Sequence, residues 1–399
     1  MRRKISPSAG CGTIIAPPSK SASHRALIAG ALSERSVIKN LGSSADIDAT
    51  LSCLKIMGAQ AEFTEEGLVI GGLDPKNTPS CTINCNESGS TLRFFVPLCL
   101  LSGNPITLTG TKKLLSRPLT EYADLCRDNG FDFILKEDSL TVCGKLEGGE
   151  YKMSGERSSQ FITGMMYTLP ILDKKSTLEV TGDAQSISYI DLTEQIIRDF
   201  GISVRRNALT FSFEGSQKYA GRDFVIEGDY SNAAFPDAFN MTGGNIVVTG
   251  LREDSTQGDK VYKELFKKLG TDETIDLSDC PDLAPVLFAL AGIYGGKFTG
   301  TKRLRLKESD RVEAMKQELK KCGIDLIDGE NDVIISPVGL HAPEEIISGH
   351  NDHRIVMAMS VLLSKLGGTI EGTNAVRKSW PGFFDEIRKL GIEVSDEIQ

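Results

Sequence analysis

The chain has 399 residues, enough for two or three domains that each bury a core of their own. Its formal net charge of −9 argues against a general nucleic-acid-binding protein and, taken alone, also against anionic substrates. Glycine is in excess at 40 residues, so positions with unusual backbone angles or close approaches should recur along the chain.

Neither a membrane span nor a targeting signal is visible in the sequence. The longest apolar run, residues 284–294, is far shorter than the roughly 20 residues that a membrane helix needs. The basic start, residues 1–12, lacks the apolar stretch of a secretory signal. The nine cysteines are scattered and odd in number, which is typical of reduced thiols in the cytosol. We therefore expect a cytoplasmic protein.

The sequence also disfavours the common cofactors. There are only four histidines, and no cysteine or histidine pair has the spacing of a metal site, so a zinc enzyme is not expected. Neither the phosphate-binding G-x-x-x-x-G-K-[ST] nor the dinucleotide-binding G-x-G-x-x-G motif occurs, which argues against ATP and NAD.

In chain order, one pattern recurs six times: a helix that ends in glycine, most often followed by an apolar strand. A glycine at a helix C-terminus is where left-handed backbone geometry is needed. Most steps between equivalent glycines are about 70 residues, with one shorter step, and such a period indicates repeated supersecondary units. The six glycines are Gly58, Gly130, Gly201, Gly270, Gly323 and Gly391.

Each unit contains two kinds of helix. One kind is amphipathic and suits a surface, whereas the other is apolar on nearly every side and must be buried. The apolar helices are expected at residues 22–32, 92–101, 161–172, 283–294 and 355–363. Six units therefore predict two α/β domains of three units each, with helices packed inside a wall of sheet, and a hinge near residues 227–230.

Polar residues precede the buried helices. Serine, aspartate and asparagine there can simply cap a helix. Capping does not require cations, and a cation in the first turn opposes the helix dipole. Beside free backbone N–H groups, cations are instead suited to binding anions. Such cations are Lys20, Arg25, Arg93 and Arg354.

The loops before the surface helices carry a second polar set, and each member has an ordinary alternative. Glu308 and Arg311 could form a simple i, i+3 ion pair, and Lys378 could be a solvated lysine. Asp282 could cap its helix, and His353 could be a capping or core histidine. Each alternative is favoured for a single site. Cations that recur at equivalent places in the repeat favour one shared anion-binding site.

Seven motifs carry a resemblance to a known family. They are PPSKSASHR (17–25), ESGSTLR (87–93), SRPL (116–119), SSQF (158–161), LKESDR (306–311), NDHR (351–354) and KSWP (378–381). In this order, over about residues 12–384, they resemble the EPSP synthases, the 3-phosphoshikimate 1-carboxyvinyltransferases. The resemblance implies an inside-out α/β fold of two domains with three βαβαββ units each. It places residues 13–227 in the N-terminal domain and residues 1–12 with 228–399 in the C-terminal domain.

The resemblance also implies a reaction: the enolpyruvyl group of phosphoenolpyruvate is transferred to the 5-hydroxyl of shikimate 3-phosphate, and phosphate is released. It implies small-molecule substrates, a monomer, no nucleic acid, no membrane, no metal and no organic cofactor. The implied shikimate 3-phosphate residues are Lys20, Ser21, Arg25, Ser158, Ser159, Gln160, Ser186, Asp282 and Lys307. The implied phosphoenolpyruvate residues are Lys20, Gly89, Arg117, Gln160, Arg311, Arg354 and Lys378. The implied catalytic residues are Asp282, Glu308, Lys20 and Lys378.

Three positions depart from the family pattern: Glu87 and Arg303 stand where asparagine is usual, and Pro18 replaces a common glycine. Gly89 matches the glycine of family members that are sensitive to glyphosate, so we expect inhibition that competes with phosphoenolpyruvate. Two alternatives stay open. The related transferase that acts on UDP-N-acetylglucosamine has a Lys-Asn pair near its start and a reactive loop cysteine, which this chain lacks. A non-catalytic phospholigand-binding module would not require Asp282 and Glu308.

Overall fold

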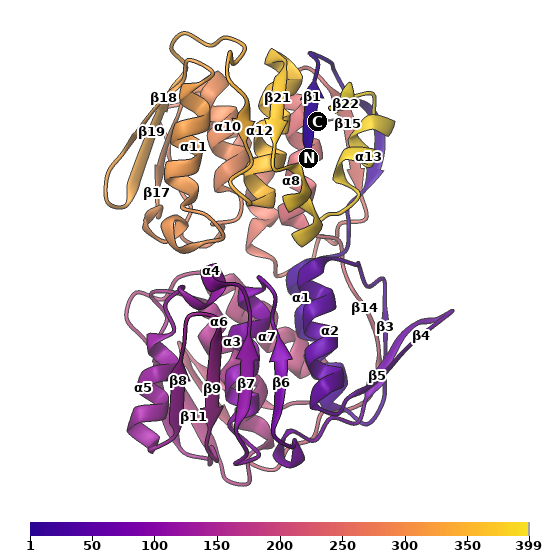
Figure 1. The fold of residues 1–399 in the computed structure, drawn as a ribbon, viewed down its shortest axis with the longest axis vertical. Helices are drawn as coiled ribbons and strands as arrows, with labels where there is room; N and C mark the ends of the chain where they lie inside the picture. The colour runs from indigo at the N-terminus through magenta and orange to yellow at the C-terminus, as the bar shows by residue number, and fades with distance from the viewer. Residues whose placement is uncertain (398–399) are drawn as a thin grey trace. The chain divides into compact units, whose positions relative to one another are not determined.

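The computed structural model describes residues 1–397 and divides the chain into two compact units. The N-terminal unit comprises Lys20–Ile226. The C-terminal unit comprises Met1–Ser19 together with the chain from Glu227 onward. Figure 1 shows both units as mixtures of helices and strands.

Three four-stranded sheets of one topology enclose the N-terminal unit. In each sheet the first two strands are parallel and the last two form an antiparallel hairpin. In spatial order the sheets are β14 (Asp223–Val225), β3 (Ser36–Lys39), β5 (Gly67–Gly71) and β4 (Gln60–Thr64); β6 (Cys81–Asn84), β7 (Ile106–Thr109), β9 (Ser139–Cys143) and β8 (Asp132–Leu135); and β10 (Glu150–Ser154), β11 (Ser176–Thr181), β13 (Thr210–Phe213) and β12 (Val204–Asn207). This is the predicted βαβαββ unit, repeated three times.

The predicted apolar helices form the centre of this unit. They are α1 (Lys20–Leu32), α3 (Gly89–Cys99) and α6 (Ser159–Thr168), and nearly all their residues are buried. Pro97 lies inside α3, whereas α6 gives way to a 3-10 turn, Leu169–Ile171, that contains Pro170. The other helices are α2 (Ala45–Met57), α4 (Lys112–Leu115), α5 (Thr120–Asn129) and α7 (Ile187–Asp199), with a 3-10 turn at Pro75–Asn77.

The C-terminal unit repeats the pattern with two changes. Its sheets are β16 (Thr274–Asp276), β17 (Gly296–Thr299), β19 (Asp332–Ser336) and β18 (Asp325–Asp328); β20 (Ile347–Ser348), β21 (Gly368–Glu371), β1 (Arg2–Ile5) and β22 (Val394–Glu397); and a pair, β15 (Asn245–Thr249) with β2 (Cys11–Ile15). The N-terminal strand β1 thus lies between two strands from the end of the chain. Within residues 1–397 the fourth unit has no hairpin after its surface helix, which explains the shorter step from Gly270 to Gly323.

The buried helices of this unit are α8 (Tyr230–Ala238), α10 (Ala284–Tyr294) and α12 (His353–Leu366). The surface helices are α9 (Tyr262–Lys268), α11 (Arg311–Lys320) and α13 (Phe383–Lys389). Short 3-10 segments lie at Phe239–Thr242, Gly258–Val261, Lys302–Leu306 and Thr373–Lys378. The apolar residues of each unit form one continuous core. Helices packed inside a sheet wall are therefore confirmed.

The six glycines of the repeat have the predicted geometry. Gly58 ends α2 with φ 118° and Gly130 ends α5 with φ 69°, both in the left-handed region. Their N–H groups bond to carbonyl oxygens of the last helical turn. The other four also have positive φ values, between 73° and 92°. Glycine recurs here because a Cβ is strained in this conformation.

Two chain segments connect the units, and they pair with each other inside the C-terminal unit. The Ser19 N–H donates to the Glu227 carbonyl and the Asp229 N–H donates to the Pro17 carbonyl, each over 2.8 Å. Strand β2 pairs in parallel with β15, so residues 13–19 pack with the C-terminal unit. The division at the start of the chain therefore follows Ser19, whereas the sequence-based expectation placed it after residue 12.

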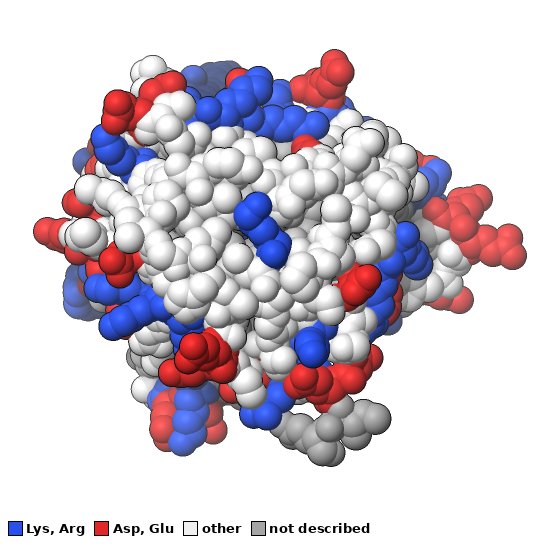
Figure 2. Space-filling model, turned by 90° about the horizontal axis from the view of Figure 1, so that it is seen from above, with Lys and Arg blue, Asp and Glu red and all other residues white. Residues whose placement is uncertain are grey.

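Charge is distributed rather than collected on the face shown in Figure 2. There, Lys and Arg side chains alternate with Asp and Glu around a largely uncharged centre. The net charge of −9 therefore does not describe the local potential at any one helix start. Within residues 1–397 no helix is long and apolar enough to cross a membrane.

Candidate active site

The start of α1 places Lys20 and Arg25 in the N-terminal unit. Lys20 Nζ lies 2.9 Å from a carboxylate oxygen of Asp46, at the start of α2. The buried Arg25 guanidinium donates to Thr193 Oγ1 over 2.8 Å and to the Tyr189 carbonyl over 3.1 Å. It also donates to the carbonyl of Ser21 over 2.9 Å. Hydrogen bonds to residues of α7 thus hold the Arg25 guanidinium in one orientation.

The start of α3 brings four predicted residues together. A Cβ atom added at Gly89 would lie 2.9 Å from Arg117 Nη1, 3.2 Å from Arg93 Nη1 and 3.6 Å from Gln160 Oε1. Gln160 accepts from Arg93 Nη1 over 2.8 Å and donates to Ser90 Oγ over 2.9 Å. A side chain here would have to displace the end of the flexible Arg117 side chain, whereas the backbone angles of Gly89 are ordinary for a helix.

Arg117 differs from its neighbour Arg93. The Arg93 guanidinium is held by Gln160, by the Pro118 carbonyl over 3.3 Å and by the ring face of Phe161. Within residues 1–397 no side-chain hydrogen bond or ion pair holds the Arg117 guanidinium, and its buried Nε has no acceptor. A buried N–H without an acceptor is costly, so this group is suited to an anionic ligand.

The remaining predicted groups of this unit lie at the starts of α6 and α7. Ser158 is the N-cap of α6 and accepts the Gln160 N–H over 3.3 Å. Ser159 follows it and is buried. Ser186 precedes α7 in the left-handed region, with φ 55° and no capping hydrogen bond from its side chain. A non-glycine residue in this conformation often marks a functional site.

In the C-terminal unit, Asp282 is the centre of an ion-pair cluster. Its two carboxylate oxygens lie 2.8 Å from Arg311 Nη1 and 2.8 Å from Arg354 Nη2. Lys307 Nζ lies 3.9 Å away. Helix α10 has Leu283 as its N-cap, so Asp282 lies one residue before the cap position.

Arg311 connects three carboxylates and is only 1% exposed. Besides Asp282, its Nη2 lies 2.8 Å from Glu308 and its Nε lies 2.9 Å from Asp352. The i, i+3 pair with Glu308 therefore exists, but as one side of a larger network. Asp352 also accepts the Arg354 N–H as the N-cap of α12. Three carboxylates thus balance the cations of this cluster.

Burial and neighbouring charges shift the pKa values in this cluster. Burial alone would raise the pKa of Asp282, but Arg354, Lys307 and Arg311 outweigh it and hold this pKa well below the usual range. Burial lowers the pKa of Lys307 to about 8, although Asp282 opposes the shift. Asp282 is therefore a carboxylate at neutral pH, and Lys307 is a cation that loses its charge in mildly alkaline solution.

Lys378 lies near the start of α12 rather than in solvent. It is buried, and its Nζ donates to the Asn351 carbonyl over 2.6 Å, so the solvated-lysine alternative is wrong. Asn351 and the preceding His350 both have positive φ values, 52° and 47°. Two consecutive non-glycine residues in this region indicate a strained turn just before α12.

Sequence reasoning missed two partners in these clusters. Asp46 pairs with Lys20 but carries no motif, since only its place at the start of α2 could have drawn attention to it. Asp352 belongs to the NDHR motif and is fully buried against Arg311, but it was not among the expected site residues. Of the departures from the family pattern, Arg303 is buried and donates to the Ser278 carbonyl over 3.0 Å. Pro18 forms a β-bridge with Gly228.

These two sets of residues can bind phosphate and carboxylate groups and can exchange protons through the half-buried carboxylates Asp282 and Glu308. Within residues 1–397 no cluster of histidine, cysteine, aspartate and glutamate has a geometry that could hold a metal ion. Cations and serines at helix N-termini are suited to binding anionic small molecules, so these helix starts define an anion-binding class of protein.

Comparisons with known proteins identify the family. The EPSP synthase (3-phosphoshikimate 1-carboxyvinyltransferase) family model matches residues 6–274 and 271–387. The 3-phosphoshikimate 1-carboxyvinyltransferase of Clostridium kluyveri is 38% identical over 421 aligned residues, with 98% of each chain covered. That of Clostridioides difficile is 36% identical, again with 98% of each covered. An Acinetobacter baumannii EPSP synthase structure matches with a TM-score of 0.78 and 25% identity, covering 99% of this chain and 100% of its own. The chain belongs to the EPSP synthase family.

Proposed function

We propose that this chain is an enzyme that transfers the enolpyruvyl group of phosphoenolpyruvate to the 5-hydroxyl of shikimate 3-phosphate. The products are 5-enolpyruvylshikimate 3-phosphate and inorganic phosphate, so the reaction belongs to the shikimate pathway of aromatic amino acid biosynthesis. Near-full-length similarity to relatives that carry this name supports the proposal.

The observation that carries the proposal is the Arg117 guanidinium beside Gly89, which no side-chain hydrogen bond or ion pair holds within residues 1–397. Both substrates carry a phosphate and a carboxylate, and a free guanidinium can bind either group through two parallel hydrogen bonds. We assign phosphoenolpyruvate to Lys20, Gly89, Arg117, Gln160, Arg311, Arg354 and Lys378.

Shikimate 3-phosphate requires cations and directional hydroxyl donors. Serine hydroxyls and the glutamine amide can donate to phosphate and hydroxyl oxygens. Ser158, Ser159 and Gln160 start one buried helix, and Lys20, Ser21 and Arg25 start another. We assign shikimate 3-phosphate to Lys20, Ser21, Arg25, Ser158, Ser159, Gln160, Ser186, Asp282 and Lys307.

The chemistry is an addition followed by an elimination. Asp282 takes the proton of the attacking 5-hydroxyl, whose oxygen bonds to C2 of phosphoenolpyruvate. Glu308 or Lys378 delivers a proton to the methylene carbon, which gives a tetrahedral intermediate. Loss of that proton together with phosphate then restores the double bond. Fixed cations, including Lys20, stabilise the charge that develops.

Asp282 can act as the base only when a substrate also binds its arginine partners, Arg311 and Arg354. As a carboxylate at neutral pH it is ready to accept a proton, but Arg311 and Arg354 lower its basicity. A substrate phosphate or carboxylate that binds the same guanidinium groups weakens their hold on Asp282. Substrate binding therefore raises the pKa of this group at the step that needs a base.

The test is phosphate release with both substrates together. The purified chain should release phosphate only when phosphoenolpyruvate and shikimate 3-phosphate are both present, and Asp282→Asn should reduce kcat about 10²-fold or more. Release with UDP-N-acetylglucosamine in place of shikimate 3-phosphate would favour the related transferase. Binding without release would favour a non-catalytic module, and unchanged turnover in Asp282→Asn would refute the base role.

Glyphosate should inhibit the enzyme in competition with phosphoenolpyruvate. The inhibitor carries a phosphonate and a carboxylate, so it can occupy the cations around Gly89 without a side chain in its way. Steady-state inhibition at several phosphoenolpyruvate concentrations measures this. Full activity at millimolar glyphosate would contradict the expectation.

A further inference from the structure

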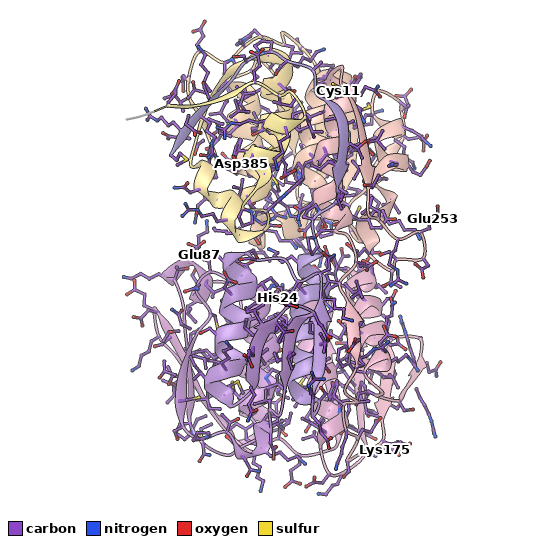
Figure 3. All side chains as sticks on the ribbon, turned by 90° about the vertical axis from the view of Figure 1, so that its right-hand side faces the viewer. Cys11, His24, Glu87, Lys175, Glu253 and Asp385 are labelled. Atoms are coloured by element: carbon purple, nitrogen blue, oxygen red, sulfur yellow. The ribbon has the colours of Figure 1, made fainter. Side chains whose placement is uncertain are left out.

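A chain of buried polar side chains crosses three helices of the N-terminal unit beside Gly89. It joins His24 of α1, Thr50 of α2, and Thr91 and Ser88 at the start of α3, and each is at most 1% exposed. Three contacts of 2.7 Å connect them: His24 Nδ1 to Thr50 Oγ1, Thr50 Oγ1 to Thr91 Oγ1, and Thr91 Oγ1 to Ser88 Oγ. His24 is labelled in Figure 3. None of these four side chains has a role in the reaction proposed above.

The hydrogen bonds of this chain can run in only one direction. The Thr91 hydroxyl donates to Ser88 Oγ, and a hydroxyl has a single hydrogen. Thr50 must therefore donate to Thr91, which leaves Thr50 as the acceptor from His24. The His24 ring then carries its hydrogen on Nδ1.

The other ring nitrogen agrees with this assignment. His24 Nε2 is buried and has no hydrogen-bond partner within residues 1–397. Burial lowers the pKa of His24 well below its usual value, and the nearby cations Lys20 and Arg25 lower it further. The ring is therefore neutral, and it lies nearly perpendicular to the ring of Phe94, with 6.3 Å between the ring centroids.

Ser88, the last of these four hydrogen-bonded side chains, fixes the backbone beside Gly89, where phosphoenolpyruvate is proposed to bind. Ser88 is the N-cap of α3 and accepts both the Thr91 N–H, over 3.2 Å, and the Thr91 hydroxyl. A Cβ atom at the next residue, Gly89, would lie 2.9 Å from Arg117 Nη1 and 3.2 Å from Arg93 Nη1, so the two guanidinium groups lie directly against this backbone. A shift of a few tenths of an ångström at Ser88 therefore changes the space in which a ligand meets Arg117.

We infer that His24, Thr50 and Thr91 form a relay of positioning residues that sets the place of Ser88 and Gly89 for phosphoenolpyruvate. The relay also connects α3 to α1 and α2, the helices that carry Lys20 and its partner Asp46. This inference rests on the proposed function, because it names phosphoenolpyruvate as the ligand at Gly89.

Thr50→Val tests the relay because it removes one hydroxyl at nearly constant shape. It leaves the His24 Nδ1–H without an acceptor and Thr91 without a donor. We expect the KM for phosphoenolpyruvate to rise about tenfold, the equivalent of one buried hydrogen bond. The KM for shikimate 3-phosphate and kcat should stay within about twofold. Thr50→Ser, which restores the hydroxyl, should restore the KM.

Thr168→Val is the matched control. Thr168 is equally buried in the same unit, and its hydroxyl donates to the Gly164 carbonyl within α6 over 3.0 Å, away from the relay. Both variants should lower the melting temperature, but only Thr50→Val should change the KM for phosphoenolpyruvate selectively. The positioning role would be overturned if Thr50→Val raised both KM values equally. It would also be overturned if Thr168→Val raised the KM for phosphoenolpyruvate selectively.

The ring tautomer gives an independent readout in the full chain. Nitrogen-15 NMR, with the signal assigned by comparison with His24→Gln, should show a neutral Nδ1–H ring that does not titrate between pH 6 and 8. An Nε2–H ring, or a normal titration, would refute the relay. If the wild type releases no phosphate, the proposed function fails, while the NMR result still decides whether the relay exists.

Discussion

Arg117 and Arg354 show how differently two predicted anion-binding arginines are placed. Arg354 is already paired with Asp282, whereas the Arg117 guanidinium has no side-chain partner within residues 1–397. An arginine that pairs with the protein contributes to stability and must exchange partners to bind a ligand. An unpaired one is free for the ligand, at a cost in the folded protein.

Arg117→Ala should therefore weaken the binding of phosphoenolpyruvate while leaving the stability of the fold almost unchanged. We expect the KM for phosphoenolpyruvate to rise about 100-fold, because a charge-assisted bidentate contact of roughly 3 kcal/mol is lost. The free energy of unfolding should change by less than about 1 kcal/mol. Arg127→Ala, which removes an exposed arginine paired with Asp124, is the control and should leave KM unchanged. A KM for Arg117→Ala within twofold of the wild type would contradict the assignment.

Lys307 should give shikimate 3-phosphate binding a pH dependence. Its pKa of about 8 means that the ammonium is charged below pH 8 and neutral above it. Since the charged form attracts the phosphate, the KM for shikimate 3-phosphate should rise as the pH increases through about 8. Lys307→Arg keeps its charge and should flatten this part of the profile. Equal profiles for the two proteins would exclude Lys307 as the titrating group.

At the scale of elements, the local features of the fold could be predicted from the sequence, but the pairing of residues far apart in the chain could not. The apolar helices and the glycine helix ends follow from composition and spacing within a few turns, and the structure confirms both. The missing hairpin of the fourth unit left only a shorter spacing in the sequence. The pairing of Lys20 with Asp46 and of Arg311 with Asp352 depends on helices brought together by the fold, so no spacing rule could show it.

Strand β1 gives the clearest prediction about an element. It lies between β21 and β22 and pairs with both, and its Ile5 is fully buried. Ile5→Ala should lower the free energy of unfolding by about 2–4 kcal/mol, because a large apolar side chain leaves a cavity in the core. The neighbouring Lys4 is exposed, so Lys4→Ala should change it by less than about 0.5 kcal/mol. Equal urea-unfolding midpoints for the two variants would show that β1 is not a structural part of this sheet.

For the whole molecule, the net charge was a poor guide to the substrate. The total of −9 averages over both units, whereas cations gather at a few helix starts where the local potential acts on a ligand. The order of seven motifs along the chain was the better guide, because together they specify both the repeat and the residues at its helix starts. Which cations are neutralised and which are free could only be learned from the fold.

The central claim is that one chain catalyses a transfer between two phosphorylated substrates. Phosphorus NMR of the purified protein with equal amounts of phosphoenolpyruvate and shikimate 3-phosphate tests it most directly. The account predicts that both substrate signals decline together while inorganic phosphate and one new phosphomonoester appear in equal amounts. Persistence of both substrate signals, or phosphate release without the new phosphomonoester, would contradict it.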